Sequence, residues 1–357
     1  MSATDALAES EVRWRMPAEW EPHERCLVAW PTRAELWEQH FDAAKREYAA
    51  TIDAISNFEP VTVVANPGDA PEVRSMCSAG VDVVELEIDD SWIRDSGPIY
   101  VVDDRGHRTG IDFGFNSWGE KFLPYAADAD IARRLLDEFG EQRRAVEMVL
   151  EGGAITVDGE GTLITTEQCL LNDNRNPSMD RDGIERILRA TLGVESIIWL
   201  PFGGYEDAHT DGHVDGVCTF VAPGRVVAQT IDDPANPNYA LMQANLEVLR
   251  TATDARGRSL DIIELPLLPY VDLDGLEVVC SYPNFYVANG GVVLPIADCP
   301  LDAAALGIME AAFPGREVIG VPSRVIAFGG GGTHCITQQI PLGTSKPRAT
   351  TTGGSHE

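Results

Sequence analysis

The sequence predicts an α/β fold in which one supersecondary unit is repeated around a common centre. Stretches with apolar residues at helical spacing alternate along the chain with short apolar runs typical of buried strands. Five such helix-then-strand units can be counted, and pairs of short β-like runs lie between them. Because one unit of this kind cannot bury its apolar face alone, several copies are expected to pack together. An ordinary doubly wound α/β sheet would show the same alternation and is the alternative.

The five units follow one another along the chain, and each predicted helix ends shortly before a run rich in Val, Ile or Leu. The helix and strand pairs are 39–56 with 61–67, 131–139 with 145–150, 180–192 with 195–201, 239–255 with 260–266, and 301–313 with 316–322. The Asp-Gly and Glu-Gly steps within 158–161 predict a hairpin between 154–157 and 162–165. A further buried strand is expected at 26–31.

The chain of 357 residues is expected to form a single domain over 16–342, with a flexible N-terminus at 1–15 and a disordered tail at 343–357. Seven cysteines without a C-x-x-C pair fit neither a disulfide framework nor a zinc ribbon, and they indicate a reducing compartment. The first residues are polar and acidic, and no apolar run reaches the roughly 18 residues of a membrane span. We therefore expect a cytoplasmic protein.

The formal net charge of -30 is the main anomaly of the composition. Such a surface repels phosphate backbones and anionic lipids, so neither a nucleic acid nor a membrane is expected as a partner. Attraction of a cationic substrate is one interpretation of the charge. Solubility, or the composition of the source organism, is the other.

A run of four glycines at 329–332 is followed closely by Cys335. The apolar run 325–328 before it is expected to be a strand, and the glycines allow the backbone to turn sharply and approach a ligand. Cys335 is then expected at the edge of a cavity, where its thiolate can act as a nucleophile. A small buried core residue is the alternative for any cysteine. That alternative is preferred for three others beside apolar β-like runs, Cys169, Cys218 and Cys280.

Four polar clusters are each expected to follow a strand, which would gather them at one end of the scaffold. They are 89–98, 151–153, 205–216 and the segment around Cys335. Carboxylates in these clusters can hold a planar guanidinium edge-on while Trp92 covers one of its faces. A thiolate that attacks the central carbon, with a histidine that protonates the departing amine and then activates water, would break a C–N bond.

Two acidic residues and one histidine have specific alternatives. His213 and Asp215 flank Val214 in a stretch predicted to be extended, so both polar side chains are expected to point the same way. A hydrogen-bonded structural residue is the alternative for His213. The alternatives for Asp95 and Glu151 are a turn residue and the end of a strand.

A metal site is the rival hypothesis for the third cluster. His209, Asp211, His213 and Asp215 offer donors for zinc or manganese at a spacing of two residues. The cluster lies in a glycine-containing loop without a recognised metal motif, so the thiol hypothesis is preferred.

A series of motifs, in the same order along the chain, resembles those of agmatine deiminases and of the related bacterial peptidylarginine-deiminase-type enzymes. The motifs lie at 16–22, 90–98, 151–153, 165–177, 212–215, 281–291 and 334–339. The resemblance runs from about residue 16 to 341 and implies a five-bladed pseudo-symmetric α/β propeller, in agreement with the five units counted above. It also implies that the enzyme uses no metal and no cofactor.

The resemblance implies a role for each matching residue. Cys335 would be the nucleophile, His213 the general acid and base, and Glu151 a support for the histidine and the substrate nitrogens. Asp95 and Asp215 would grip the guanidinium. The residues expected around the rest of the substrate are Trp92, Asp90, Asp211 and Gly332.

The implied reaction is hydrolysis of agmatine to N-carbamoylputrescine and ammonia through a thiouronium-like intermediate on Cys335. Gly216, Gly332 and Thr333 depart from the residues usual in the family, which leaves another guanidine open as the substrate: arginine, peptidyl arginine or another guanidino amine. Because Arg94 is the one notable cation in the clusters, we expect selection for a small cation without an α-carboxylate. A non-enzymatic polyamine- or arginine-binding protein is a further alternative, and a homodimer stays open.

Overall fold

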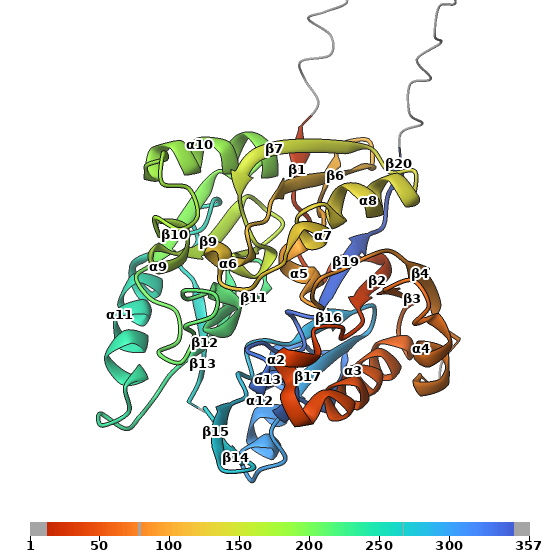
Figure 1. Ribbon diagram of the computed structural model, residues 1–357. Coiled ribbons are helices and arrows are strands. Elements are labelled where there is room, and N and C mark those ends of the chain that lie inside the picture. Colours follow the sequence, from red (N-terminus) through yellow and green to blue (C-terminus); the bar gives the residue numbers. More distant parts are fainter. Residues whose placement is uncertain (1–12, 78–79, 267, 346–357) are drawn as a thin grey trace, which may run out of the picture.

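The computed structural model describes residues 13–77, 80–266 and 268–345 (Figure 1). Within these residues, five three-stranded units share one pattern: the first strand pairs antiparallel with the second, and the second pairs parallel with the third. The units are β19 (Thr337–Pro341), β2 (His23–Ala29) and β3 (Val61–Ala65); β5 (Ile99–Asp103), β6 (His107–Gly114) and β7 (Arg143–Val149); β8 (Ile155–Val157), β9 (Thr162–Thr166) and β10 (Ser196–Leu200); β11 (Cys218–Ala222), β12 (Arg225–Gln229) and β13 (Asp261–Leu265); and β16 (Tyr286–Ala288), β17 (Gly291–Ile296) and β18 (Glu317–Pro322).

One longer helix joins the second and third strands of each unit. These helices are α3 (Phe41–Ser56), α8 (Ile131–Glu138), α10 (Arg181–Leu192), α11 (Asn238–Thr251) and α12 (Asp302–Ala312). The boundaries of α10 show why the sequence is locally informative: Asp180 Oδ1 accepts a hydrogen bond from the backbone N–H of Gly183, and Gly193 ends the helix at a φ of 69°. The five predicted helix and strand pairs are therefore present, with ends shifted by a few residues.

Shorter elements connect the units. The short helices are α2 (Ala34–Trp37), α4 (Ala70–Met76), α5 (Ile93–Ser96), α6 (Ser117–Glu120), α7 (Ala126–Ala129), α9 (Glu167–Leu170) and α13 (Arg324–Phe328), with the 3₁₀ turns η2 (Glu38–His40), η3 (Gly152–Ala154) and η4 (Val214–Gly216). The remaining strands are β4 (Asp82–Glu85), which pairs with β3, the hairpin β14 (Tyr270–Leu273) and β15 (Leu276–Val279), and the two-residue strands β1 (Trp14–Arg15) and β20 (Thr344–Ser345).

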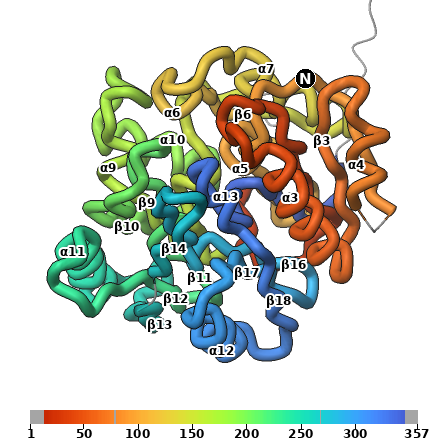
Figure 2. Tube along the Cα trace, turned by 60° about the horizontal axis from the view of Figure 1, so that its bottom comes forward, coloured from red at the N-terminus to blue at the C-terminus, as the bar shows by residue number. Residues whose placement is uncertain are grey.

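The two ends of the described chain meet in one unit. Strand β19 pairs antiparallel with β2, so residues 337–341 complete the sheet that the N-terminal part begins. Figure 2 shows the red N-terminal segments beside the blue C-terminal ones. Apolar residues are buried in several clusters rather than in one layer, as expected when repeated units each cover their own helix. The predicted mixed α/β class is confirmed.

One predicted element next to the site is wrong. The apolar run 325–328, expected as a strand, lies in the helix α13. Glu47 Oε2, from helix α3, accepts hydrogen bonds from the backbone N–H groups of Val325 and Ile326 at 2.9 and 2.8 Å. A carboxylate at the first turn of a helix satisfies free N–H groups there, and a short apolar run alone does not distinguish a helix from a strand.

Both predicted tails are paired at their inner edges. Trp14 and Arg15 form β1 against β5, and Thr344 and Ser345 form β20 against β6. The rest of the two segments, 1–12 and 346–357, lies outside the described residues. In the part of the chain that the structure describes, no helix has the length and apolar content that a membrane crossing requires.

Candidate active site

A cavity of about 380 Å³ opens beside Cys335. Its wall includes His213 and Asp215, from the segment around η4, and Asn284, from the loop before β16. A much smaller hollow on the other side of the thiol is lined by Trp92 and Asp95, among others. Cys335, with only 7% of its surface exposed, lines both spaces. The expected position at a cavity edge is therefore what the structure has.

The glycine run before Cys335 allows side chains to come close to the backbone. A Cβ atom at Gly331 would collide with the Trp92 ring, and one at Gly332 would lie 2.5 Å from Asn284 Oδ1. Neither position accepts a larger residue without displacing a neighbour of Cys335. Gly332 thus shapes the site by leaving room for Asn284, although the residue itself does not line the cavity.

The thiol of Cys335 lies among polar groups. Asn284 Nδ2 donates a hydrogen bond to Sγ at 3.3 Å, and Sγ lies 3.6 Å from Asp215 Oδ2. Burial, followed by the negative charges of Asp215 and Asp95, raises the pKa of Cys335 well above its ordinary value. The free protein therefore holds a protonated thiol, and a cation placed between the carboxylates would favour the thiolate.

The stretch from His213 to Asp215 is not the predicted strand. Val214 begins the 3₁₀ turn η4, after Gly212, which has a φ of 93°. Asp207 Oδ2 accepts a hydrogen bond from the His213 backbone N–H at 3.0 Å and helps to hold this turn. The two polar side chains still point the same way, as expected, although the backbone is not extended. Val214 is fully buried, while His213 and Asp215 both line the cavity.

The His213 ring is buried without a hydrogen-bond partner for either nitrogen among the residues that the structure describes. Nδ1 lies 3.8 Å from Asp95 Oδ2. Burial by itself lowers the pKa of His213, but Asp95, Cys169 and Asp215 together outweigh that effect and raise the pKa well above its usual value. The ring is therefore held as an imidazolium that can donate a proton into the cavity.

Asp95 is oriented by two donors. The backbone N–H of Gly153 donates to Oδ1 at 2.9 Å, and Trp118 Nε1 donates to Oδ2 at 3.0 Å. Asp95 belongs to α5 and follows β4, and Trp118 comes from a turn in which its own φ is 54°. Burial raises the pKa of Asp95 more than its neighbours lower it, so this carboxylate gains from a cationic ligand. Nothing in the sequence around Trp118 indicates that its indole reaches Asp95.

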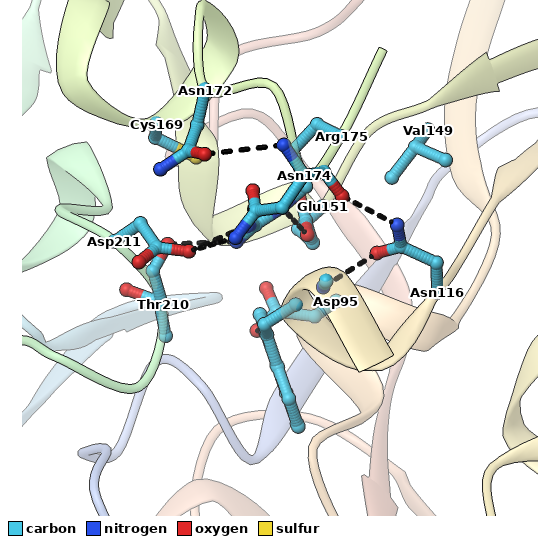
Figure 3. A network of polar contacts seen from close by, with 12 residues as sticks. Asp95, Asn116, Val149, Glu151, Cys169, Asn172, Asn174, Arg175, Thr210 and Asp211 are labelled. Atoms are coloured by element: carbon cyan, nitrogen blue, oxygen red, sulfur yellow. Dashed lines mark hydrogen bonds and ion pairs between the residues drawn. The ribbon is translucent and has the colours of Figure 1, made fainter. Parts of the chain in front are cut away.

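Glu151 lies at the end of β7 and is fully buried, but an arginine rather than the cavity faces one of its oxygens (Figure 3). Arg175 Nε donates to Glu151 Oε1 at 2.5 Å, and Arg175 Nη1 donates to Asp211 Oδ2 at 2.7 Å. Glu151 Oε2 has no partner among the described residues. Arg175 therefore neutralises Glu151 and leaves one oxygen for His213 or a ligand.

The remaining predicted residues are placed as follows. Trp92 and Asp90 line the smaller hollow, and Asp90 accepts a hydrogen bond from Arg33 Nε at 2.9 Å. Asp211 does not line the main cavity, because its carboxylate is paired with Arg175 and, at 2.7 Å, with Lys121 Nζ. Its role is to tie loops together.

The four residues proposed as metal ligands in the rival hypothesis do not come together. Asp211 is engaged by two cations, so the predicted row of His209, Asp211, His213 and Asp215 forms no common set. Within the described residues, the group of three donors close enough to share an ion is Glu151, Cys169 and His213, with donor atoms within 4.8 Å of one another. Cys169, interpreted from sequence as a core residue, is buried and next to the histidine.

One cation, Arg175, and two other residues near the site, Asn284 and His334, were not assigned a place in it from the sequence. Arg94, the one cation expected there, points away from the cavity and donates through Nη1 to Gln339 Oε1 at 2.7 Å. Arg175 is the cation that supports Glu151. Asn284 and His334 belong to the motifs that resemble those of the family. His334 could have been singled out from the sequence because it is a polar residue directly before the candidate nucleophile.

A buried thiol, a histidine and a carboxylate line one cavity, and the carboxylate of Asp95 lies 3.8 Å from that histidine; these are the groups that a cysteine-dependent enzyme uses on a small planar cation. Residues 15–341 match the family described as Porphyromonas-type peptidyl-arginine deiminase. The chain belongs to this family.

Named relatives agree with that assignment. The chain is 46% identical to the agmatine deiminase of Pseudomonas aeruginosa (strain LESB58), with 92% of this chain and 95% of the relative covered. It is similar in structure to an agmatine deiminase of Enterococcus faecalis, with a TM-score of 0.88, 34% identity, and 92% and 96% of the two chains covered. It is also similar to a cysteine-to-serine variant of the C. jejuni agmatine deiminase with substrate bound, with a TM-score of 0.86, 27% identity, and 94% and 98% covered.

Proposed function

We propose that the protein is a hydrolase that converts agmatine to N-carbamoylputrescine and ammonia, with Cys335 as the nucleophile. The observation that carries this proposal is the joint position of Cys335, His213 and Asp215 on one cavity, in a chain 46% identical to an agmatine deiminase over 92% of its length. No cofactor is needed for the steps below, since each is performed by side chains of the site.

Agmatine binds with its guanidinium between Asp95 and Asp215, whose carboxylates match its N–H groups. Among the described residues that line the cavity, none is Arg or Lys, whereas Glu206 and Glu277 carry carboxylates. These two suit the ammonium at the other end of agmatine. The α-carboxylate of free arginine would have no cation to pair with there, which favours agmatine.

The guanidinium also activates the nucleophile. Burial, and then the charges of Asp215 and Asp95, raise the pKa of the Cys335 thiol in the free protein, and a cation bound between the two carboxylates offsets their part of that effect. The thiol proton leaves to solvent, and the thiolate adds to the guanidinium carbon to give a neutral tetrahedral adduct. Asn284, which donates to Sγ at 3.3 Å, stabilises the thiolate.

His213 serves both halves of the reaction. As an imidazolium it gives a proton to one amino group of the tetrahedral adduct, the C–N bond breaks, ammonia leaves, and a thiouronium cation remains on Cys335. The neutral ring then takes a proton from water, and the hydroxide adds to the same carbon. The C–S bond breaks, the thiolate departs with its electron pair, and the remaining hydroxyl proton is lost as the ureido product forms.

We also propose that the five units are the blades of a five-bladed propeller formed by a single domain over 16–342. The repeated strand pattern supports this, as does the pairing of β19 with β2, which brings the two ends of the chain together. A cytoplasmic location is supported by the seven cysteines, all of which are free. A small cationic guanidine is the partner we propose, and a homodimer is the assembly to test first.

The test is the release of ammonia and of a ureido product from purified protein supplied with agmatine, arginine or an arginyl peptide. We expect agmatine to be turned over fastest and a chelator to have no effect. Equal or faster turnover of free arginine would overturn the substrate assignment. Loss of activity with the chelator, regained on addition of zinc or manganese, would overturn the cofactor-free mechanism.

A further inference from the structure

The ring of His334 lies between two carboxylates. Nδ1 is 2.8 Å from Asp215 Oδ2, and Nε2 is 2.8 Å from Glu19 Oε1. The side chains are 3%, 4% and 9% exposed for His334, Asp215 and Glu19. Both distances are those of short, charge-assisted hydrogen bonds, and water is largely excluded from them.

Two such contacts constrain where the protons are. A neutral imidazole carries one N–H, so one of its nitrogens would face a carboxylate oxygen with no hydrogen between them. Only the imidazolium donates on both sides. The charges then balance, because the anions Asp215 and Glu19 face the cations His334 and Arg94, whose Nη1 lies 3.5 Å from Glu19 Oε1.

We propose that His334 is a positioning residue that stays an imidazolium and holds Asp215 ionised and aimed at Cys335, with Glu19 as the anion that keeps the imidazolium charged. The proposal rests on the proposed function, in which Asp215 grips the guanidinium. It gives a role to the segment 16–22, none of whose residues lines either of the two hollows at Cys335.

The geometry transmits the position of the ring to the reacting atoms. Asp215 Oδ2 is the same oxygen that lies 3.6 Å from Cys335 Sγ, and His334 directly precedes Cys335 in the chain. The backbone N–H of His334 donates to Asn284 Oδ1 at 3.0 Å, and its carbonyl oxygen accepts from Arg94 Nε at 3.3 Å. The backbone of His334 is therefore held on both sides, and the carboxylates of Asp215 and Glu19 oppose a rotation of its ring.

The groups that face the ring favour the charged form. Burial and the charge of Arg94 lower the pKa of His334, but Glu19 and Asp215 raise it more. Glu19 shows the matching effect: burial opposes its ionisation, yet His334 and Arg94 lower the pKa of Glu19 to about 2.

The charge state is tested by NMR of the full chain with its seven histidines labelled with ¹³C and ¹⁵N. The His334 signal is assigned by its absence in His334→Gln. We expect both ring nitrogens of His334 to be protonated at pH 8, and Glu19→Gln to lower the pH at which the ring titrates. A neutral His334 ring at pH 7 in the wild-type protein would overturn the proposal.

Kinetics on agmatine test the positioning role. Glu19→Gln and His334→Gln should each lower kcat/KM on the order of 10- to 100-fold, the effect of one lost charged hydrogen bond, with a raised KM because Asp215 is no longer held in place. His107→Gln, whose partly exposed ring on β6 pairs with Asp103 on β5, is the matched control and should keep wild-type kinetics. Unchanged kcat/KM in a folded Glu19→Gln protein would contradict the role.

If the wild-type protein itself releases no ammonia from agmatine, the proposed function fails, while the NMR result still decides the charge of His334.

Discussion

His334 is hydrogen-bonded to Asp215, and His213 lines the same cavity as Asp215, yet the surroundings of the two rings are opposite. Both ring nitrogens of His334 are paired with carboxylates at 2.8 Å. Neither nitrogen of His213 has a hydrogen-bond partner among the described residues, although the ring is equally buried. A buried polar group without partners costs stability, and such a group is retained where a ligand or a reacting proton will use it.

The difference separates two kinds of contribution to one site. A fully paired imidazolium keeps its proton and fixes its neighbours, which suits a positioning role. An imidazolium without a hydrogen-bond partner among the described residues can give its proton away, which suits acid and base chemistry. Burial and charge alone do not distinguish the two histidines, because nearby carboxylates raise the pKa of both.

The largest effect on activity is expected from replacing His213. His213→Gln should lower kcat on agmatine by roughly 10²- to 10⁴-fold, because it removes the general acid and base. The free energy of unfolding should also fall, because the variant loses the buried ion pair between Nδ1 and Asp95 Oδ2 at 3.8 Å, although no hydrogen bond of the ring is lost among the described residues. Steady-state kinetics and urea unfolding measure the two effects. A large loss of stability with normal kcat in the folded fraction would reverse the roles of the two histidines.

Arg175 tests whether the carboxylate beside His213 needs its own counter-charge. Arg175→Ala leaves Glu151 fully buried and unpaired, so we expect a loss of about 3 to 5 kcal/mol in the free energy of unfolding. Arg189→Ala, which breaks a more exposed ion pair with Glu185, is the control and should cost less than about 1 kcal/mol. Equal effects of the two substitutions in urea unfolding would contradict the claim that the buried Glu151 carboxylate depends on Arg175 for its counter-charge.

Acid unfolding tests whether Glu19, the partner of His334, stabilises the fold through its charge. The pKa of Glu19 is about 2 in the folded protein and 4.5 ordinarily, so ionised Glu19 stabilises the fold above pH 4.5 and loses this contribution as the pH falls toward 2. The wild-type protein should therefore be on the order of 2 to 3 kcal/mol more stable than Glu19→Gln at pH 7, with a smaller difference at pH 3. A difference independent of pH would mean that Glu19 acts through packing rather than charge.

Local pattern predicted most of the fold. The helix and strand pairs were predictable because each has a clear apolar period and a recognisable end, such as Asp180 and Gly193 around α10. The run 325–328 was mispredicted because Glu47, far away in sequence, caps it as a helix. The direction of His213 and Asp215 was right although the predicted strand is a 3₁₀ turn.

The site residues that belong to recognised motifs were predictable from the sequence. Cys335, His213, Asp215 and Asp95 converge as expected. The contacts that support them join segments hundreds of residues apart, as with Glu19 and His334, and no local spacing signals such a pair. Local spacing also gave no sign of the partners of Asp211. Its place in the sequence suggested a contact with the ligand, but its carboxylate is paired with Arg175 and Lys121.

The central claim is that Cys335 forms a covalent bond to the guanidinium carbon. The most direct test is intact-protein and peptide mass spectrometry after a rapid acid quench of the wild-type protein during turnover of agmatine, since His213→Gln would slow the formation of the adduct as well as its hydrolysis. We predict an added mass equal to agmatine less ammonia, located on Cys335 and absent from Cys335→Ala. Product formation by Cys335→Ala, or turnover by the wild-type protein without an adduct, would contradict the account.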